Sequence, residues 1–222
     1  MAHAFFLGVD VDPSSSEQSP AVTHALFEKE TEGDHDEVTY RLDHIRRHTD
    51  VASADDLADH LQSLVAGRPY IGRTSLIINR NTEFSQALVD ALRERGLDPV
   101  VATLTEGSGV AAGGTDEIGV HLGGIDAVRT IADLQRERKL IFESHTTEAA
   151  SRLARDMQEL ADQLDEADGD LEALGTSTSG PSFDPEATHV TSAALAVWLG
   201  TERSFDPSQR LKESPRTEPS SE

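Results

Sequence analysis

The chain has 222 residues, enough for one domain of ordinary size, and no cysteine, so disulfides, thiolate zinc sites and cysteine nucleophiles are excluded. Asp and Glu total 41 against 19 Lys and Arg, a formal net charge of −22, and the only lysines are Lys29, Lys139 and Lys212. Self-repulsion of this size is tolerable where molar salt shortens the Debye length to about 3 Å, so the composition favours a halophilic protein over an acidic mesophilic one.

The N-terminal third is predicted to be β structure. Apolar or alternating runs at 4–11, 21–30 and 38–48 are joined by short polar connections, as in an antiparallel meander. The first run, AFFLGVDV, carries Asp10 near its end. Because a buried carboxylate is costly without a partner, Asp10 indicates either a metal ligand at the rim of a sheet or an outward-facing side chain on an edge strand.

The middle of the chain changes to a helical period. Ser53 is placed to cap a helix whose leucines share one face. A buried strand is predicted at 74–79, then a helix at 84–95 that ends at Gly96, then another strand at 99–104. A strand, a helix and a strand of these lengths form a βαβ unit, which implies parallel pairing.

The second half is predicted to be mainly helical. The glycine-rich stretch 107–114 is expected to be a mobile surface connection, followed by helices at 124–138, 147–164 and 187–200. Residues 1–200 would form one domain that includes an acidic flexible loop at about 165–187. An acidic disordered tail is expected at 201–222.

The predicted order, three strands and then helix, strand, helix, strand, is that of the RNase H fold. This α/β fold has a five-stranded mixed sheet, three antiparallel strands then two parallel ones, with helices on both faces. Its first and fourth strands are neighbours, so Asp10 is expected near the end of the strand at 74–79. Phosphodiester hydrolysis with two Mg²⁺ ions about 4 Å apart needs several carboxylates at this place.

Four segments carry a wider resemblance: FFLGVDVD, LIINRNTEFSQALVDALRERG, the helical region that begins with GIDAVRT, and HVTSAALAVW. In these segments, over about residues 4–199, the chain resembles the nuclease domain of phage large terminases. That family belongs to the RNase H-like group, which also holds Holliday-junction resolvases. The resemblance implies a nuclease for phage DNA packaging that acts on double-stranded DNA with Mg²⁺ or Mn²⁺.

The resemblance assigns positions to a metal site. Asp10 occupies the family's first metal-binding position, and Asp12 is close enough to be the residue meant. Asn79 stands where the family has an acid directly after the fourth strand. The family's last helix begins with one or two acids, whereas residues 187–193 have none and offer His189 as a ligand. The implied metal site is therefore Asp10, Asp12, Asn79 and His189, with Asp10 and Asn79 at the catalytic positions.

Two of the three expected carboxylates are missing from this set. Asn is neutral and holds Mg²⁺ far more weakly than Asp, and one acid does not neutralise two divalent ions. We therefore expect a weakened or inactive nuclease, unless Glu83, Asp184 or Glu186 supplies the missing charge.

The most basic stretch, RLDHIRRH, contains Arg41, Arg46 and Arg47, and Arg80 follows the fourth strand. These four arginines are the predicted nucleic-acid-binding residues, because cationic side chains contact phosphates. A surface strand that balances nearby acids explains RLDHIRRH equally well.

Sequence features that are absent bear on the expected partners and on the location. No Gly-Lys-Ser/Thr phosphate loop occurs, so the chain would be the nuclease half alone, with a separate packaging ATPase or portal as partner. No apolar run of membrane-spanning length and no secretory signal occur, so we expect no membrane partner and a cytoplasmic location, that of the host if the protein is viral.

The nine histidines give no motif. His35, His44, His48 and His60 lack HExxH-like spacing, and most histidines are expected to be solvated or capping groups. The sequence is also compatible with two hypotheses other than a terminase nuclease. One is a non-catalytic RNase H-like module that binds DNA or protein, and the other is an endonuclease of the Holliday-junction-resolvase type.

Overall fold

A computed structural model describes residues 4–15, 20–32, 37–49, 51–105, 110–112, 119–142, 148–166 and 188–202. Its strands are β1 (Ala4–Val11), β2 (Val22–Glu32), β3 (Glu37–His48), β4 (Thr74–Asn79), β5 (Val100–Thr105), β6 (Val110–Ala112), β7 (Val120–Gly123) and β8 (Leu140–Phe142). Its helices are α1 (Ala54–Ala66), α2 (Glu83–Glu94), α3 (Gly124–Arg136), α4 (Glu148–Glu166) and α6 (Thr188–Glu202).

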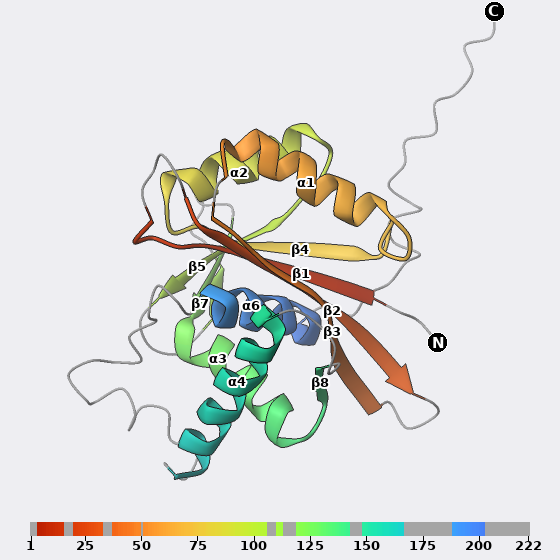
Figure 1. Cartoon of the computed structure of the whole chain (residues 1–222), viewed down its shortest axis with the longest axis vertical. Helices are drawn as coiled ribbons and strands as arrows, with labels where there is room; N and C mark the ends of the chain where they lie inside the picture. The colour runs from red at the N-terminus through yellow and green to blue at the C-terminus, as the bar shows by residue number, and fades with distance from the viewer. Residues whose placement is uncertain are drawn as a thin grey trace, which may run out of the picture.

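All eight strands form one sheet in the order β6-β7-β5-β4-β1-β2-β3-β8. The central five reproduce the predicted topology, because β1 pairs antiparallel with β2 and β2 with β3, while β1, β4 and β5 are parallel. The fold is therefore the predicted α/β class with a mixed sheet. Helices α1 and α2 cover one face, and α3, α4 and α6 lie on the other (Figure 1).

Three short strands extend the sheet beyond the prediction. β7 runs parallel to β5, β6 runs antiparallel to β7, and β8 pairs in parallel with β3. The expected mobile connection at 107–114 was wrong in part, because 110–112 form β6 and pair with β7. The remainder of that stretch lies outside the described residues.

Capping residues set the ends of the two helices on the α1 side. The Ser53 hydroxyl accepts from the Asp56 backbone N–H at 3.1 Å, as predicted from its position before α1. Thr82 and Ser85 form a reciprocal capping box that begins α2. Gly96 follows α2 with φ of 76°, a conformation that favours glycine.

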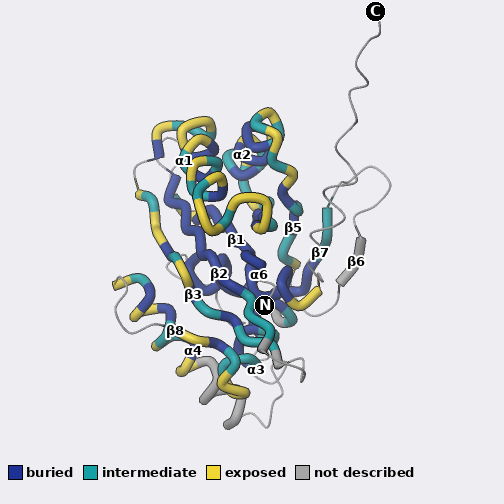
Figure 2. The backbone as a smooth tube through the Cα atoms, turned by 90° about the vertical axis from the view of Figure 1, so that its right-hand side faces the viewer, coloured by how far each residue is buried: buried dark blue, intermediate teal, exposed yellow. Residues whose placement is uncertain are grey.

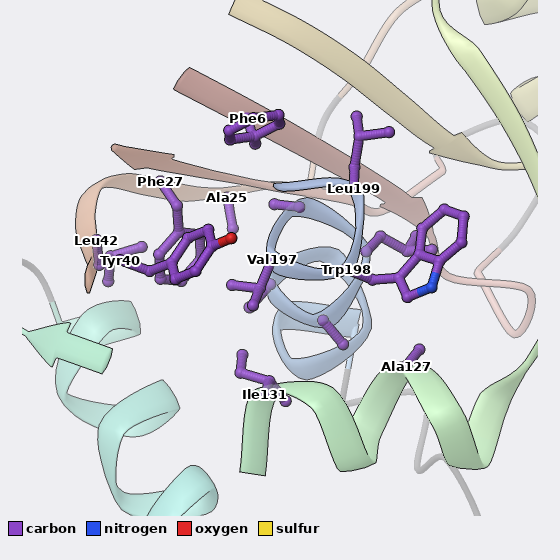
Figure 3. Close-up of a cluster of buried hydrophobic side chains, with 14 of the residues drawn as sticks. Phe6, Ala25, Phe27, Tyr40, Leu42, Ala127, Ile131, Val197, Trp198 and Leu199 are labelled. Carbon is purple, nitrogen blue, oxygen red and sulfur yellow. The ribbon is translucent and has the colours of Figure 1, made fainter. Parts of the chain in front are cut away.

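Helix α6 is the centre of one of two hydrophobic cores. Every residue from Thr188 to Gly200 is buried, as expected for a helix that is apolar all round. Val197, Trp198 and Leu199 lie among side chains of the sheet and of α3, with Ala127 and Ile131 below them (Figure 3). The helix lies directly against the sheet at Gly8 of β1, where a Cβ would lie only 2.0 Å from the Ser192 carbonyl oxygen.

The second core fills the space between the sheet and the pair α1–α2. It is built from the strand residues that point away from α6, including Leu7, Val9 and Leu26, and from the buried face of each helix. The outer faces of α1 and α2 are exposed, whereas the central strands are buried (Figure 2). β1 is thus buried on both faces, which rules out the edge-strand explanation of Asp10.

Among the described helices, none combines the length and apolar character that a membrane span requires. Most of the predicted acidic loop at 165–187 lies outside the described residues, apart from the end of α4, and so do Asp184 and Glu186. The predicted tail at 201–222 also lies outside them, except for the last two residues of α6.

Candidate functional site

The candidate site lies where β1 and β4 end side by side. Asp10 is only 4 % exposed, and its Oδ1 accepts a hydrogen bond of 2.8 Å from Asn79 Nδ2. The strands are in parallel register, so both carboxyl ends meet at the same edge, as expected from the sequence. The structure therefore brings these two predicted site residues into direct contact.

Asp10 points to the α6 side of the sheet. Its cross-strand neighbour on β2 is Thr23, and directly opposed residues of an antiparallel pair share a face. The Thr23 hydroxyl bonds with the Thr188 hydroxyl at 2.8 Å, at the first residue of α6. The beginning of α6 thus lies beside the end of β1.

Asn81, which the sequence analysis did not single out, belongs to the same contact network. Its Nδ2 donates to the Val11 carbonyl oxygen at 2.8 Å and lies 3.4 Å from Asp10 Oδ1. The available signal was its place two residues beyond the end of β4, in the loop at the same edge. Two amide groups therefore face one carboxylate oxygen.

Burial is the main influence on the protonation state of Asp10. It raises the pKa of this carboxyl to about 7, against the lowering effects of the Asn79 hydrogen bond and the Val11 backbone. The nearby negative charge of Asp12 adds to the rise of this pKa. Asp10 is therefore protonated in a large fraction of molecules near neutral pH.

Asp12 is engaged by its own loop and by β3. Its Oδ1 accepts from the Ser14 backbone N–H at 2.9 Å and from the Ser14 hydroxyl at 2.7 Å. Its Oδ2 forms an ion pair of 3.2 Å with Arg47. Both carboxylate oxygens thus have protein partners, and a metal ion would have to displace them.

His189 is the second residue of α6 and is buried. Its Nε2 lies 2.7 Å from Asp156 Oδ2 on α4, a contact that sequence spacing did not reveal. Arg152 and Arg155 also lie within 4.0 Å of the Asp156 carboxylate. An acidic side chain of α4 thus lies near the beginning of α6, where the terminase family has an acid on the last helix itself.

The predicted DNA-binding arginines divide between the two faces of the sheet. Arg47 pairs with Asp12 on the Asp10 side, whereas Arg41 pairs with Glu28 and Glu30 on the α1 side. Arg46 is next to Arg47 in an alternating strand and therefore lies on the α1 side as well. Arg80 directly follows Asn79 at the end of β4. RLDHIRRH is therefore not one continuous basic surface.

The expectation that most histidines are solvated or capping groups was wrong for four of them. His24, His44, His48 and His60 pack ring against ring, with centroids 5.0 to 5.9 Å apart. The signal was weak, because residues from β2, β3 and α1 meet only through the sheet register and the crossing of α1.

The donor set near Asp10 fits one weakly bound divalent ion and does not fit two. Asn79 Oδ1 is buried without a hydrogen-bond partner among the described residues, so this oxygen is available to a cation. Asp10 supplies one carboxylate. The predicted substitute Glu83 is exposed at the start of α2. Two Mg²⁺ or Mn²⁺ ions need more negative charge than this.

No family model and no curated protein matches this sequence. Among solved structures, the chain is similar to the terminase nuclease domain of human cytomegalovirus, soaked with manganese and bound to an inhibitor. The two share 12% identity and a TM-score of 0.39, over 70% of this chain and 76% of that one. A similarity this distant supports no inference about activity.

Proposed function

We propose that this chain is an RNase H-like nuclease domain of the terminase type, for phage DNA packaging, whose weakened metal centre gives slow cleavage or none. The observation that supports it best is the meeting of Asp10 and Asn79 at the adjacent ends of two parallel strands, next to the beginning of α6. Burying an acid at this edge costs free energy and adds nothing to the hydrophobic core, so a role in function is the better explanation for Asp10.

The metal of this proposal is Mg²⁺ or Mn²⁺. Asp10 and the Asn79 carbonyl oxygen would hold one ion, with water as its remaining ligands. A bound ion would supply a metal-activated water as nucleophile and neutralise charge on the phosphate. Asn81 would keep the Asp10 carboxylate in place, since it bonds to the adjacent backbone.

Asp12, two residues beyond Asp10, is a second acid at this edge. It would join the site only by releasing Arg47, whose guanidinium would then be free to contact a phosphate. Arg47 and Arg80 are accordingly the preferred DNA contacts of the proposal, and Arg41 and Arg46 belong to the opposite face. The partners would be double-stranded DNA and a separate packaging ATPase or portal, in the cytoplasm of a host cell.

A second candidate is a non-catalytic RNase H-like module that binds DNA or a packaging partner. The observation in its favour is that Asn79 and Asn81 both direct amide NH₂ groups at Asp10 Oδ1, which satisfies the carboxyl without a metal. In that case the fold is kept and cleavage is lost.

The deciding experiment is a plasmid-cleavage assay with Mn²⁺ in concentrated KCl, comparing the wild type with Asp10→Ala. Circular dichroism would verify that both proteins are folded, and a gel-shift assay on the same DNA would measure binding. Slow cleavage that is abolished by Asp10→Ala supports the weakened nuclease. Cleavage that survives the substitution overturns it.

Two other results select between the alternatives. DNA binding by folded wild-type protein without any cleavage, unchanged in Asp10→Ala, favours the non-catalytic module. A preference for four-way junctions over linear duplex, in binding or in cleavage, favours an enzyme of the resolvase type.

A further inference from the structure

A cluster of histidines lies on the face of the sheet opposite to Asp10. His24 is directly opposite Val9, whose side chain packs into the core beneath α1 and α2, whereas its neighbour Thr23 faces α6. His44 and His48 of β3 share the face of His24, since they pair with Leu26 and Val22 of β2. His60 reaches the same place from α1.

Three of these rings approach one another as the ligands of a metal ion do. One ring nitrogen each of His24, His48 and His60 lies within 4.8 Å of the other two. His24 Nδ1 and His48 Nε2 are 3.1 Å apart. Two imidazole nitrogens on a tetrahedral zinc ion lie about 3.3 Å apart, since each zinc–nitrogen bond is about 2.0–2.1 Å.

The cluster also leaves polar atoms unsatisfied, which is an independent observation. His24 is completely buried, and its Nε2 has no hydrogen-bond partner among the described residues. The buried Nε2 of His60 lacks a partner as well. A buried nitrogen without a partner costs about 1–3 kcal/mol, and a bound cation would remove that cost at His60 Nε2 by taking its lone pair. At His24 the cation would bind Nδ1, the ring nitrogen that faces His48, and Nε2 would keep its cost.

The electrostatic setting keeps the rings neutral. Burial lowers the pKa of His24 well below its ordinary value and that of His48 to about 4, and the neighbouring histidines and Arg46 lower both further. Neutral imidazole is the form that binds metal. Arg46 is the charge that opposes a cation here, and it is exposed on the strand between His44 and His48.

We infer that His24, His48 and His60 bind one divalent transition-metal ion of the zinc class, which joins α1 to β2 and β3. Three imidazoles and no carboxylate select Zn²⁺, Co²⁺, Ni²⁺ or Cu²⁺ over Mg²⁺, which prefers oxygen. The fourth position would take water, because His48 and His60 are only partly buried. His44 stacks on His24 at 5.1 Å and would fix the orientation of that ring.

This inference is independent of the proposed nuclease function, since the two sites lie on opposite faces of the sheet. It is tested with the full chain, without a histidine tag, freed of metal and titrated with Zn²⁺ by calorimetry in concentrated KCl. The variants are His60→Gln, at a partly buried ligand, and His121→Gln on β7 as the matched control. His48→Gln takes the place of His60→Gln if that variant does not fold.

We expect one Zn²⁺ per wild-type chain, at least a tenfold loss of affinity in the ligand variant, and wild-type affinity in His121→Gln. Zn²⁺ should also raise the melting temperature of the wild type, and Mg²⁺ at the same concentration should not, because a ligand that binds the folded state stabilises it. Folded wild-type protein that binds no Zn²⁺, or a folded ligand variant that binds as well as the wild type, would overturn the inference.

Discussion

Asn79 donates a hydrogen bond of 2.8 Å to the Asp10 carboxyl across the ends of two neighbouring parallel strands. Two carboxylates in these positions would repel each other and need a cation between them. An amide in the place of one acid satisfies the other acid directly. The pair is thus stable without metal, and the same contact reduces the negative charge that a metal centre requires.

Asn79→Asp is therefore expected to increase metal affinity and to decrease stability in the absence of metal. The second buried carboxyl has no amide partner, which should lower the free energy of unfolding by about 1–3 kcal/mol in EDTA. Mn²⁺ should restore that loss, because it binds the folded state between the two acids. Urea unfolding in concentrated KCl, with EDTA or with Mn²⁺, measures both effects.

The swapped double variant Asp10→Asn/Asn79→Asp is the matched control. It keeps one acid and one amide, so it should retain near wild-type stability in EDTA and gain no Mn²⁺ affinity. If the double variant gained as much Mn²⁺ stabilisation as Asn79→Asp, the paired charge would not be the reason for binding.

Asp10→Asn is expected to stabilise the protein more as the pH rises. Burial raises the pKa of Asp10 from its ordinary value of 3.8 to about 7 in the folded state, so the folded state binds the proton more tightly. The contribution of Asp10 to stability is therefore highest below pH 3.8 and falls as the pH rises towards 7. Above this range the cost of the buried charge is on the order of 4 kcal/mol.

Measuring the free energy of unfolding of the wild type and of Asp10→Asn at pH 4 and pH 8 tests this pH dependence. The variant should be the more stable protein at pH 8, and the difference should shrink or reverse at pH 4. Asp98→Asn, at an exposed position after α2, makes the same chemical change in water and controls for the loss of one negative charge. A difference that is the same at both pH values would contradict the assignment of a strained, buried acid.

The sequence predicted the central sheet because each of its five strands carries a local signal. β1 and β4 are continuous apolar runs, as buried strands require. The βαβ unit of β4, α2 and β5 sets the parallel pairing of β4 with β5. β6, β7 and β8 have only three or four residues each. They are strands because β7 pairs with the edge of β5, β6 with β7 and β8 with the edge of β3, and no local pattern encodes these pairings.

The candidate site was predictable only where it depends on the order of the strands. Asp10 and Asn79 were paired correctly, since strand order alone puts their strands side by side. Asn81 was missed because its contact with Val11 depends on the path of a loop 70 residues away in sequence. The histidine cluster was missed because three elements contribute to it, and side chains from distant elements meet by packing geometry rather than by spacing.

The stability of the protein is expected to rise with salt. A net charge of −22 on 222 residues favours expansion of the chain, and salt reduces this repulsion by shortening the Debye length from about 10 Å at 0.1 M to about 3 Å at 1 M. The melting temperature should therefore increase over this range of KCl. Equal increases in KCl and NaCl would indicate screening, and a melting temperature that falls with salt would exclude a halophilic adaptation.

Gly8→Ala is expected to be among the most damaging single substitutions in the chain. A Cβ at Gly8 would lie 2.0 Å from the Ser192 carbonyl oxygen and 2.8 Å from the Ala196 nitrogen, so α6 would have to move away from β1. Because backbone atoms do not yield as a flexible side chain does, a loss of about 4 kcal/mol or more in the free energy of unfolding is expected.

Gly72→Ala is the matched control, because nothing lies within 4 Å of its Cβ position and its φ of 71° costs a side chain only backbone strain. It should lose about 1–2 kcal/mol. Urea unfolding of both variants in concentrated KCl gives the comparison. A Gly8→Ala protein as stable as Gly72→Ala would mean that α6 does not rest on β1 at this distance. The position of α6 beside Asp10 would then need revision as well, since the Thr188–Thr23 hydrogen bond joins α6 to β2, the strand next to β1.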